Sequence, residues 1–175
     1  MLSTKVDRPA ALERTRIGEL YVQHADRAVR LAYLLTGDRE VAEDLAQDAF
    51  VRVAGRLAHL RDPKGFDQYL RTTIVNLSNS YFRHRRVERA YLARERNISP
   101  PATDDPGRAV VEREELWRRL DGLSRRQRAA IVLRFYEDLS EAEVAETLGC
   151  APGTVKSLVS RGLEKLRGEI RDEEK

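Results

Sequence analysis

Apolar residues recur at helical spacing along almost the whole chain, and one segment interrupts the pattern. From about Ala11 onward they follow the i, i+3, i+4, i+7 spacing that places side chains on one face of an α-helix. The inward face predicted for the first helix consists of Ile17, Leu20, Tyr21, His24, Ala28, Leu31, Ala32 and Leu35. No segment shows a sustained alternation of polar and apolar residues, so strands should be few or absent. Residues 97–110 hold three prolines, a glycine and two aspartates, which is typical of a linker. The sequence therefore predicts an all-α protein of two small helical domains joined by a flexible linker.

Local signals predict where the helices begin and end. Gly37 is expected to end the first long helix and Asp38 to cap the second. Asp62 followed by Pro63 is typical of the start of a third helix. After the linker, a helix is expected from Ser124 to about Tyr136. The predicted parts of the chain are a loose leader (1–10), a first domain (11–94), the linker (95–113) and a second domain (114–175).

Composition excludes several classes of protein. Of the 175 residues 41% are hydrophobic, which is enough for a core, and the charges nearly balance at a net +3. The basic residues are mostly arginine, which favours nucleic-acid binding but equally fits a GC-rich coding sequence. Cys150 is the only cysteine, so an internal disulfide and a multi-thiolate zinc site are excluded. Its thiol is interpreted as a small core group, with a redox-sensitive thiol as the alternative.

No apolar run approaches the roughly 18 residues of a membrane span. The first residues also lack the apolar stretch of a secretory signal peptide. We therefore expect a soluble, cytoplasmic protein without membrane insertion.

Residues 140–157 are typical of a helix-turn-helix. Ser140 and Glu143 have the spacing of a capping box, and Gly149 supplies the turn. The next helix opens at Pro152, and its outward first turns present polar and basic groups where a recognition helix meets the DNA major groove. A plain helical hairpin is the alternative, but it has no need of such a face. The side chains predicted to face DNA are Thr154, Lys156, Ser157, Ser160 and Arg161, with Lys165 as a further basic group.

The helix predicted after Asp38 carries an acidic face opposite its core side. An acidic stripe is usually only a solvated surface. Here the apolar Phe50 lies at its margin, which favours a surface that binds a partner. The residues that share this face are Glu40, Asp44, Gln47, Asp48 and Val51.

The long helix that begins at Pro63 carries a polar face away from its apolar stripe. Amide, hydroxyl and guanidinium groups of this kind bond base edges and phosphates. Tyr81 and Phe82 then interleave with dense positive charge, which suits unstacked single-stranded bases. A merely basic helix end would explain Arg85 and Arg86 but not the polar stripe before them. The polar face consists of Thr72, Asn76, Asn79, Ser80 and Arg83.

No catalytic or metal-binding motif occurs in the sequence. It contains no phosphate-binding P-loop, no His-Glu-x-x-His and no Gly-x-Ser-x-Gly. His24 lies on an apolar helix face and is interpreted as a packed histidine, while His59 and His84 are far apart in the sequence. We expect no enzymatic activity, no cofactor and no metal site.

Together these segments resemble the extracytoplasmic-function (ECF, group 4) sigma factors of bacterial RNA polymerase, and most closely their actinobacterial SigE-type subset. YLLTGDREVAEDLAQDAFVRV (33–53) is similar to the family's core-polymerase-binding segment. DPKGFDQYLRTTIVNLSNSYFRHRR (62–86) is similar to its melting and −10-reading helix. LSRRQRAAIVLRFYEDLSEAEVAETLGCAPGTVKSLVSRGLEKLR (123–167) is similar to its −35-binding domain.

The resemblance implies a sigma factor that binds core RNA polymerase and directs promoter-specific initiation through a region 2 (11–94) and a region 4 (114–175). Docking on the clamp helices of the β′ subunit is implied for Asp44, Gln47, Asp48 and Phe50. Reading and melting of the −10 element are implied for His59, Arg61, Lys64, Tyr69, Thr72, Asn76, Asn79, Ser80, Arg83, Arg85 and Arg86. Recognition of the −35 element is implied for Thr154, Lys156, Ser157, Ser160, Arg161 and Lys165.

The same resemblance implies further partners, and the chain departs from the family pattern at two positions. It implies contact with the β flap, an anti-sigma factor as partner, and a linker whose Asp104 and Asp105 mimic RNA charge. Tyr69 stands where the family commonly has tryptophan, which keeps a stacking surface. Leu158 stands where an arginine is usual, which removes an expected phosphate contact.

Two other functions remain alternatives at this stage. A two-domain helix-turn-helix regulator would need a ligand pocket or a phosphoacceptor aspartate at a strand end, and the sequence shows neither. A sigma-like decoy that sequesters an anti-sigma factor would have no need of the polar face that leads from Asn76 to Arg86.

Overall fold

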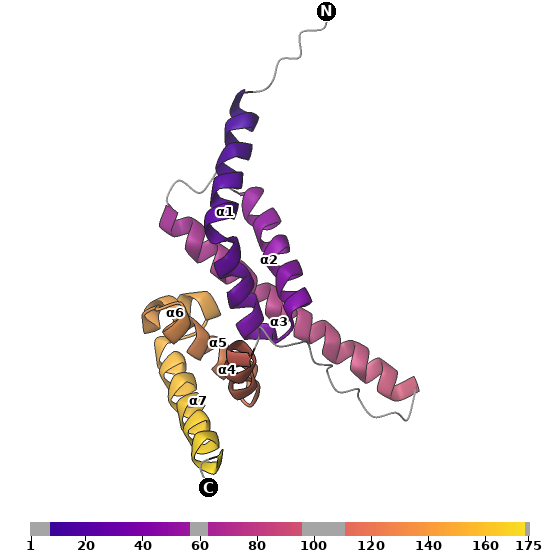
Figure 1. Cartoon of the computed structure of the whole chain (residues 1–175), viewed down its shortest axis with the longest axis vertical. Coiled ribbons are helices and arrows are strands. Elements are labelled where there is room, and N and C mark those ends of the chain that lie inside the picture. Colours follow the sequence, from indigo (N-terminus) through magenta and orange to yellow (C-terminus); the bar gives the residue numbers. More distant parts are fainter. Residues whose placement is uncertain (1–7, 57–62, 96–110, 174–175) are drawn as a thin grey trace, which may run out of the picture. The chain divides into compact units, whose positions relative to one another are not determined.

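The protein is helical wherever its structure is described. The computed structural model describes residues 8–56, 63–95 and 111–173 (Figure 1). These ranges contain helices and the turns between them, and no strand, so the all-α prediction is confirmed. In chain order the elements are α1 (Arg8–Thr36), α2 (Arg39–Ala54), α3 (Pro63–Glu95), α4 (Val111–Asp121), α5 (Arg125–Ile131), the π-helix η2 (Val132–Tyr136), α6 (Glu141–Leu148) and α7 (Pro152–Glu173).

The chain divides into two compact units, Met1–Ile74 and Val75–Lys175, and the division falls inside α3. The predicted domains instead assign all of α3 to the first part of the chain. Two predicted borders also shift, because α1 begins at Arg8, within the expected leader, and α4 begins at Val111, within the expected linker. Residues 96–110, which make up most of that linker, lie outside the described residues.

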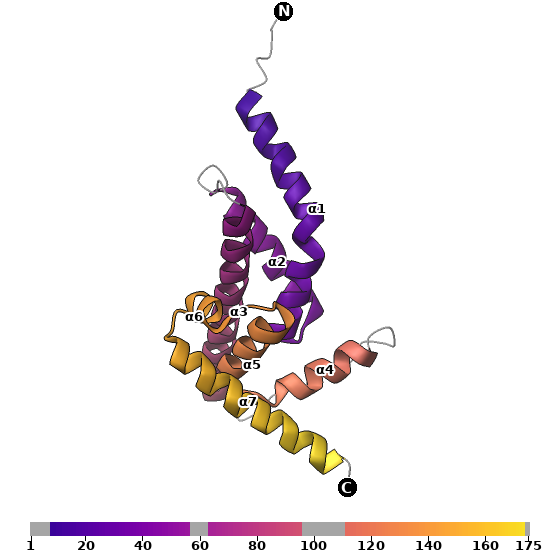
Figure 2. The same ribbon diagram turned by 90° about the vertical axis from the view of Figure 1, so that its left-hand side faces the viewer.

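The turn between α1 and α2 has the predicted cap. Gly37 adopts a φ of 76°, a conformation that glycine reaches without steric cost, and its N–H donates to the Tyr33 carbonyl at 2.7 Å. The Asp38 carboxylate then accepts the Val41 N–H at 3.1 Å and caps α2. The tight turn lays α1 and α2 side by side as an antiparallel pair, which Figure 2 shows from a second direction.

The core of the first unit forms where these two helices meet the start of α3. Alanines on α2 keep the side chains between the helices short, so the helices approach closely. The hydroxyls of Thr36 and Thr73 are buried, and each donates to the carbonyl four residues earlier, at 2.8 and 2.7 Å. The buried apolar side chains of this unit are Ala28, Leu31, Ala32, Leu34, Leu35, Ala42, Ala46, Ala49, Phe50, Val53, Phe66, Leu70 and Ile74.

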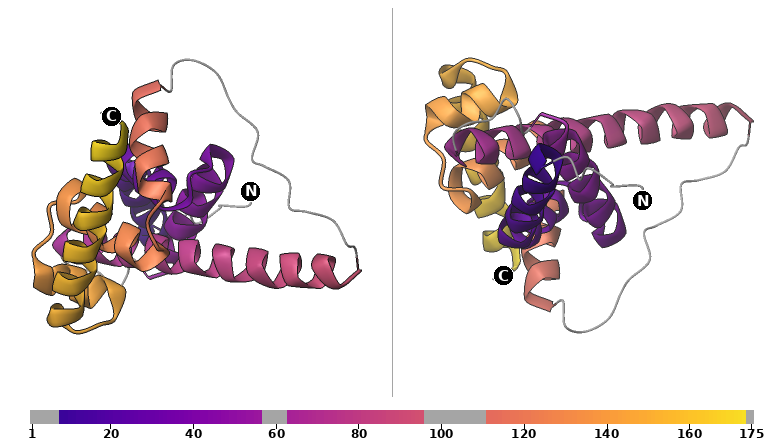
Figure 3. Two further views of the ribbon diagram at one scale, coloured as in Figure 1. Left: turned by 90° about the horizontal axis from the view of Figure 1, so that it is seen from below. Right: turned by 90° about the horizontal axis from the view of Figure 1, so that it is seen from above.

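The second unit contains the predicted helix-turn-helix. Ser140 caps α6 and forms the expected capping box with Glu143, and Gly149 ends the helix in the left-handed conformation at a φ of 61°. A second capping box joins Ser124 and Gln127 at the start of α5. Helix α7 packs along α5 and α6, as both views in Figure 3 show. The buried apolar side chains from α5 onward are Ala129, Ala130, Ile131, Val132, Leu133, Leu139, Val144, Ala145 and Val155.

One helix differs from its prediction. The sequence predicts a single α-helix from Ser124 to about Tyr136, but the α-helix ends at Ile131 and continues as the π-helix η2. Its wider last turn is closed by the Glu137 N–H, which donates to the Val132 carbonyl five residues earlier at 3.1 Å. Asp138 then adopts a φ of 53° and ends the segment.

Candidate partner-binding and nucleic-acid interfaces

Helix α2 presents the predicted acidic face to solvent. Asp44, Gln47 and Asp48 are all exposed, as is Glu40 one turn earlier. Val51 is 67% exposed and extends the same face with an apolar group. Four of the five predicted face residues are thus polar or charged side chains on one side of a capped, rigid helix, and a charged partner surface can reach them.

Phe50 does not lie on this acidic face. Its side chain is only 7% exposed, and its ring packs edge-on against the Tyr21 ring with centroids 4.9 Å apart. The Phe66 ring lies on its other side at 6.3 Å. Tyr21 is 49% exposed and covers Phe50, although its spacing places it in the predicted core stripe. Phe50 therefore supports α2 from inside, and the structure separates it from Asp44, Gln47 and Asp48.

His24 joins α1 to the start of α3. Its Nδ1 lies 3.0 Å from Asp67 Oδ1, and its ring tilts against Phe66 at a centroid distance of 5.1 Å. The histidine is therefore packed, as interpreted, and it has a carboxylate partner that the sequence pattern did not reveal. This contact positions α3 relative to the α1–α2 pair.

The polar face of α3 is exposed along one side of a continuous helix. Asn76, Asn79 and Arg83 are exposed, while Thr72 and Ser80 are half-buried. At about 100° per residue these positions share one side of α3, so the helix itself fixes their spacing. Arg83 Nη2 lies 3.4 Å from Ser80 Oγ, a weak contact that leaves the guanidinium accessible.

Tyr69 and Tyr81 on α3 each lie under an arginine guanidinium. The Arg56 guanidinium lies over the Tyr69 ring, 5.4 Å from its centroid. Arg85 lies over the Tyr81 ring at 5.6 Å, and its Nη1 also donates to the Tyr81 hydroxyl at 2.9 Å. Arg86 is exposed. Of the remaining predicted −10 residues, His59 and Arg61 lie outside the described residues, and Lys64 belongs to α3 with its side chain undescribed.

The first turns of α7 form a polar, basic surface. Lys156, Ser157, Ser160 and Arg161 are exposed and Thr154 is half-buried, so five of the six predicted −35 residues share the start of this helix. The Ser157 hydroxyl donates to the Gly153 carbonyl at 3.0 Å, which orients it along the helix. The turn at Gly149 and the capped α6 hold this end of α7 in place.

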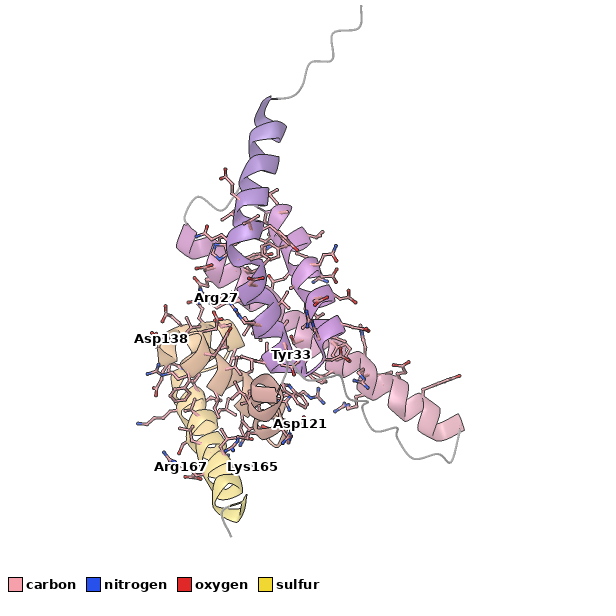
Figure 4. The ribbon with its side chains drawn as sticks, viewed as in Figure 1. Arg27, Tyr33, Asp121, Asp138, Lys165 and Arg167 are labelled. Carbon is pink, nitrogen blue, oxygen red and sulfur yellow. The ribbon has the colours of Figure 1, made fainter. Side chains whose placement is uncertain are left out.

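Lys165 does not join that cluster. Its Nζ donates to the Gly122 carbonyl at the turn between α4 and α5. In Figure 4 Lys165 and Arg167 lie far along α7, while Asp138 lies near α6 at the other end of this unit. Lys165 is thus three turns beyond Thr154 and has an intramolecular partner of its own.

Arg128 is a buried charged side chain of the second unit. Its Nε donates to the Leu120 carbonyl at 3.0 Å, and its Nη2 contacts Asp121 Oδ1 at 3.0 Å. Its guanidinium also lies 5.2 Å from the Trp117 ring centroid. Burial lowers the pKa of Arg128, and the Asp121 carboxylate opposes that shift. Arg128 therefore ties α4 to α5, a role that periodicity alone does not reveal.

Among the described side chains, no group of three His, Cys, Asp or Glu residues is arranged to hold a metal ion. No helix in the described ranges is long and apolar enough to cross a lipid bilayer.

Both halves of the chain match models of one protein family. The model of Sigma-70 region 2 matches residues 20–88, and the model of Sigma-70, region 4 matches residues 113–166. The first match contains the acidic face of α2 and the polar face of α3. The second contains the helix-turn-helix of α6 and α7. The order of the two matches is that of the two predicted domains.

Two relatives match over most of this chain. The RNA polymerase sigma-E factor of Streptomyces avermitilis is 35% identical over 153 residues, which cover 87% of this chain and 84% of the relative. The ECF RNA polymerase sigma factor SigE of Mycolicibacterium smegmatis is 37% identical over 153 residues, covering 85% of this chain and 59% of the relative.

A solved structure shares the fold. It is the sigma factor RpoE in complex with the anti-sigma factor NepR from Bartonella quintana, with a TM-score of 0.70 and 24% sequence identity. The match covers 88% of this chain and 96% of that chain. With these relatives and with both sigma regions in order, the chain belongs to the extracytoplasmic-function family of RNA polymerase sigma factors.

Proposed function

We propose that this sigma factor divides promoter-specific initiation among three of its helices. The acidic face of α2 binds the β′ clamp helices of core RNA polymerase. The polar face of α3 reads and opens the −10 element, and the first turns of α7 read the −35 element. The observation that carries the proposal is that each family region presents exposed faces with the chemistry its tasks need. A cap fixes the start of α2, and the Gly149 turn precedes the start of α7.

Docking through α2 is supported by charge and by accessibility. Asp44 and Asp48 are exposed and have no ion-pair partner among the described side chains. A cationic surface on the polymerase can therefore form charge-assisted hydrogen bonds with them without first breaking an intramolecular bridge. Phe50 takes part indirectly, because its packing against Tyr21 and Phe66 holds α2 in position.

DNA reading through α3 and α7 is supported by the types of side chain that these helices expose. The amides of Asn76 and Asn79 bond base edges, and Arg83 and Arg86 bond phosphates or bases. At α7, Lys156 and Arg161 supply phosphate contacts beside the hydroxyls of Ser157 and Ser160. His59, Arg61 and Lys64 stay in the proposal from the resemblance alone.

The proposal also names partners and a place of action. Core polymerase, including its β flap, and promoter DNA are the partners that the task requires, and an anti-sigma factor is the proposed regulator. The chain acts in the cytoplasm, where polymerase and DNA are, and its part in initiation is recognition and strand opening without an enzymatic step of its own. It needs no cofactor or metal for these contacts.

Permanganate footprinting of the −10 bubble tests the proposal. Holoenzyme assembled with the wild-type chain should make thymines reactive at the −10 element of a responsive promoter. The Asn79→Ala/Arg83→Ala variant should bind core polymerase normally and open no bubble. Glu88→Ala is the matched control, because Glu88 is exposed on the opposite side of the same helix. Normal melting by the double variant would contradict the assignment of this face.

A further inference from the structure

The end of α2 places an arginine on a ring that belongs to the proposed DNA-reading helix. The Arg56 guanidinium carbon lies 5.4 Å from the centroid of Tyr69, within the roughly 6 Å range of a cation–π contact. Arg56 is exposed and Tyr69 is half-buried, so the pair lies at the surface of the first unit. Neither the sequence pattern nor the family resemblance gave Arg56 a role.

The backbone on both sides fixes where this pair forms. The Gly55 N–H donates to the Val51 carbonyl at 3.3 Å, and the Arg56 N–H donates to the Val53 carbonyl at 2.9 Å. These bonds close the last turn of α2 and set the direction from which the Arg56 side chain leaves. Tyr69 stands within α3, and the hydroxyl of Thr73 donates to its carbonyl at 2.7 Å.

Tyr69 also lies on the side of α3 that carries the polar face. It precedes Thr72 by three residues and Asn76 by seven, so helical geometry places the three on the same side. An aromatic ring in this position offers a stacking surface to an unstacked base. In the free protein, however, the Arg56 guanidinium occupies part of that ring, so a base and the guanidinium compete for one surface.

We propose that Arg56 exchanges partners when the promoter opens. An unstacked base of the non-template strand replaces the guanidinium on the Tyr69 ring, and the released guanidinium binds a phosphate of that strand. This inference rests on the proposed function of α3 in strand opening. It adds Arg56, in the turn just after α2, to the DNA-binding surface, and it makes base stacking and phosphate binding two parts of one event.

The chemistry of the two contacts favours this exchange. A cation–π contact at an exposed site is weak, whereas the planar guanidinium forms strong charge-assisted hydrogen bonds with phosphate oxygens. No described carboxylate pairs with Arg56, so binding to phosphate requires no ion pair to break. In the free protein Arg56 covers part of the Tyr69 ring. In the open complex its guanidinium neutralises charge on the captured strand.

Two readouts on one complex test the exchange. Holoenzyme is titrated with a single-stranded non-template oligonucleotide that carries 2-aminopurine at each −10 position in turn. Fluorescence quenching at saturation reports stacking, and the slope of log affinity against log salt concentration reports phosphate contacts. The Arg56→Gln variant should lower the slope by about 0.7, the value for one contact to a single strand, and keep the quenching.

Matched variants separate the two parts of the event. Tyr69→Leu should abolish the quenching without changing the slope, and Tyr69→Phe should restore the quenching. Arg52→Gln is the control for loss of one positive charge, because Arg52 is exposed one turn earlier on α2. It should change neither readout.

The outcomes distinguish this inference from the proposed function. The exchange would be overturned if Arg56→Gln had the same salt slope as the wild type. It would also be overturned if Arg52→Gln lowered the salt slope as much as Arg56→Gln does. Wild-type holoenzyme that quenches at no position would contradict strand capture by α3 itself, and the exchange with it.

Discussion

The proposed contact of Asp48 with core polymerase can be tested by reversing one charge. It is exposed beside Asp44 and Gln47 on α2, and an interfacial charge pair that loses one partner typically costs about 2–5 kcal/mol of binding free energy. We therefore expect Asp48→Arg to weaken core-polymerase binding by that amount, measured by titration of labelled sigma factor with core enzyme. Asp26→Arg, an exposed reversal on α1, should leave the affinity unchanged. Equal core affinity of Asp48→Arg and wild type would exclude this face as the docking site.

Two adjacent arginines at the end of the polar face of α3 should differ in their effect on the salt dependence of DNA binding. Arg86 is exposed and lies seven residues after Asn79, on the same side of α3, whereas Arg85 is held by the Tyr81 ring and hydroxyl. Arg86→Gln should lower the salt slope of holoenzyme binding to promoter duplex by about 0.9, the value for one phosphate contact. Arg85→Gln should lower it less, because Arg85 already has an intramolecular partner. A larger loss from Arg85→Gln would show that the Tyr81 contact opens on DNA.

Close packing between α5 and α7 depends on one glycine. A Cβ added at Gly162 would lie 2.5 Å from Ile131 Cδ1 and 3.5 Å from Gln127 Cβ. Overpacking of this kind costs about 1–3 kcal/mol, so Gly162→Ala should lower the free energy of unfolding of the second unit by that amount in a urea titration. Adding Ile131→Val, which removes Cδ1, should restore part of the loss.

Gly168 supplies the matched control for this prediction. It lies in the same helix with no atom within 4 Å of an added Cβ. Gly168→Ala should therefore stabilise the protein by about 0.5–1 kcal/mol through helix propensity. If the two alanine variants changed stability equally, close approach at Gly162 would not be the cause.

At the scale of the helices, the sequence predicts what depends on local bonds. The caps at Asp38 and Ser140 and the left-handed turn at Gly149 appear as expected, because each needs only residues within one turn. Burial of Phe50 and exposure of Tyr21 were missed, because spacing shows which side of a helix faces inward but not where the packed neighbour ends. The π-turn of η2 was also missed, since no local residue signal distinguishes it from an α-helix.

The candidate sites show the same difference between local features, which the sequence predicts, and contacts between elements, which it does not. The exposed residues of α2, α3 and α7 were predictable because they need only helical periodicity and polar character. The contacts of Arg56 with Tyr69 and of Arg128 with Asp121 and Leu120 were not, because each joins two elements through side chains. Lys165 shows the same limit, because its position on α7 was predictable but its partner, the Gly122 carbonyl, was not.

For the whole molecule, we expect weak DNA binding without polymerase. Contacts to phosphates supply most of the non-specific affinity for DNA, and that affinity falls steeply as salt rises. The net charge of the chain is only +3. Leu158 lies between Thr154 and Arg161 on one side of α7 and is half-buried. Replacing it by arginine should tighten non-specific binding and steepen the salt slope by about 0.9. Fluorescence anisotropy of a labelled duplex measures the affinity and its salt slope. An unchanged slope would place Leu158 away from the DNA phosphates.

Core polymerase should raise the affinity of the chain for promoter DNA. By holding two weak DNA-binding surfaces at the spacing of the −35 and −10 elements, it converts the second contact into an intramolecular one with a high effective concentration. Specific binding should therefore be a property of the holoenzyme.

Run-off transcription from a promoter library tests the central claim most directly. Core polymerase should produce transcripts that depend on this chain, and their templates should share two sequence elements at a fixed spacing upstream of the start. The free chain should bind the same templates weakly in an anisotropy titration. The account would be contradicted if core polymerase gave no chain-dependent transcripts while the free chain bound one duplex sequence with nanomolar affinity, as a conventional repressor or activator does.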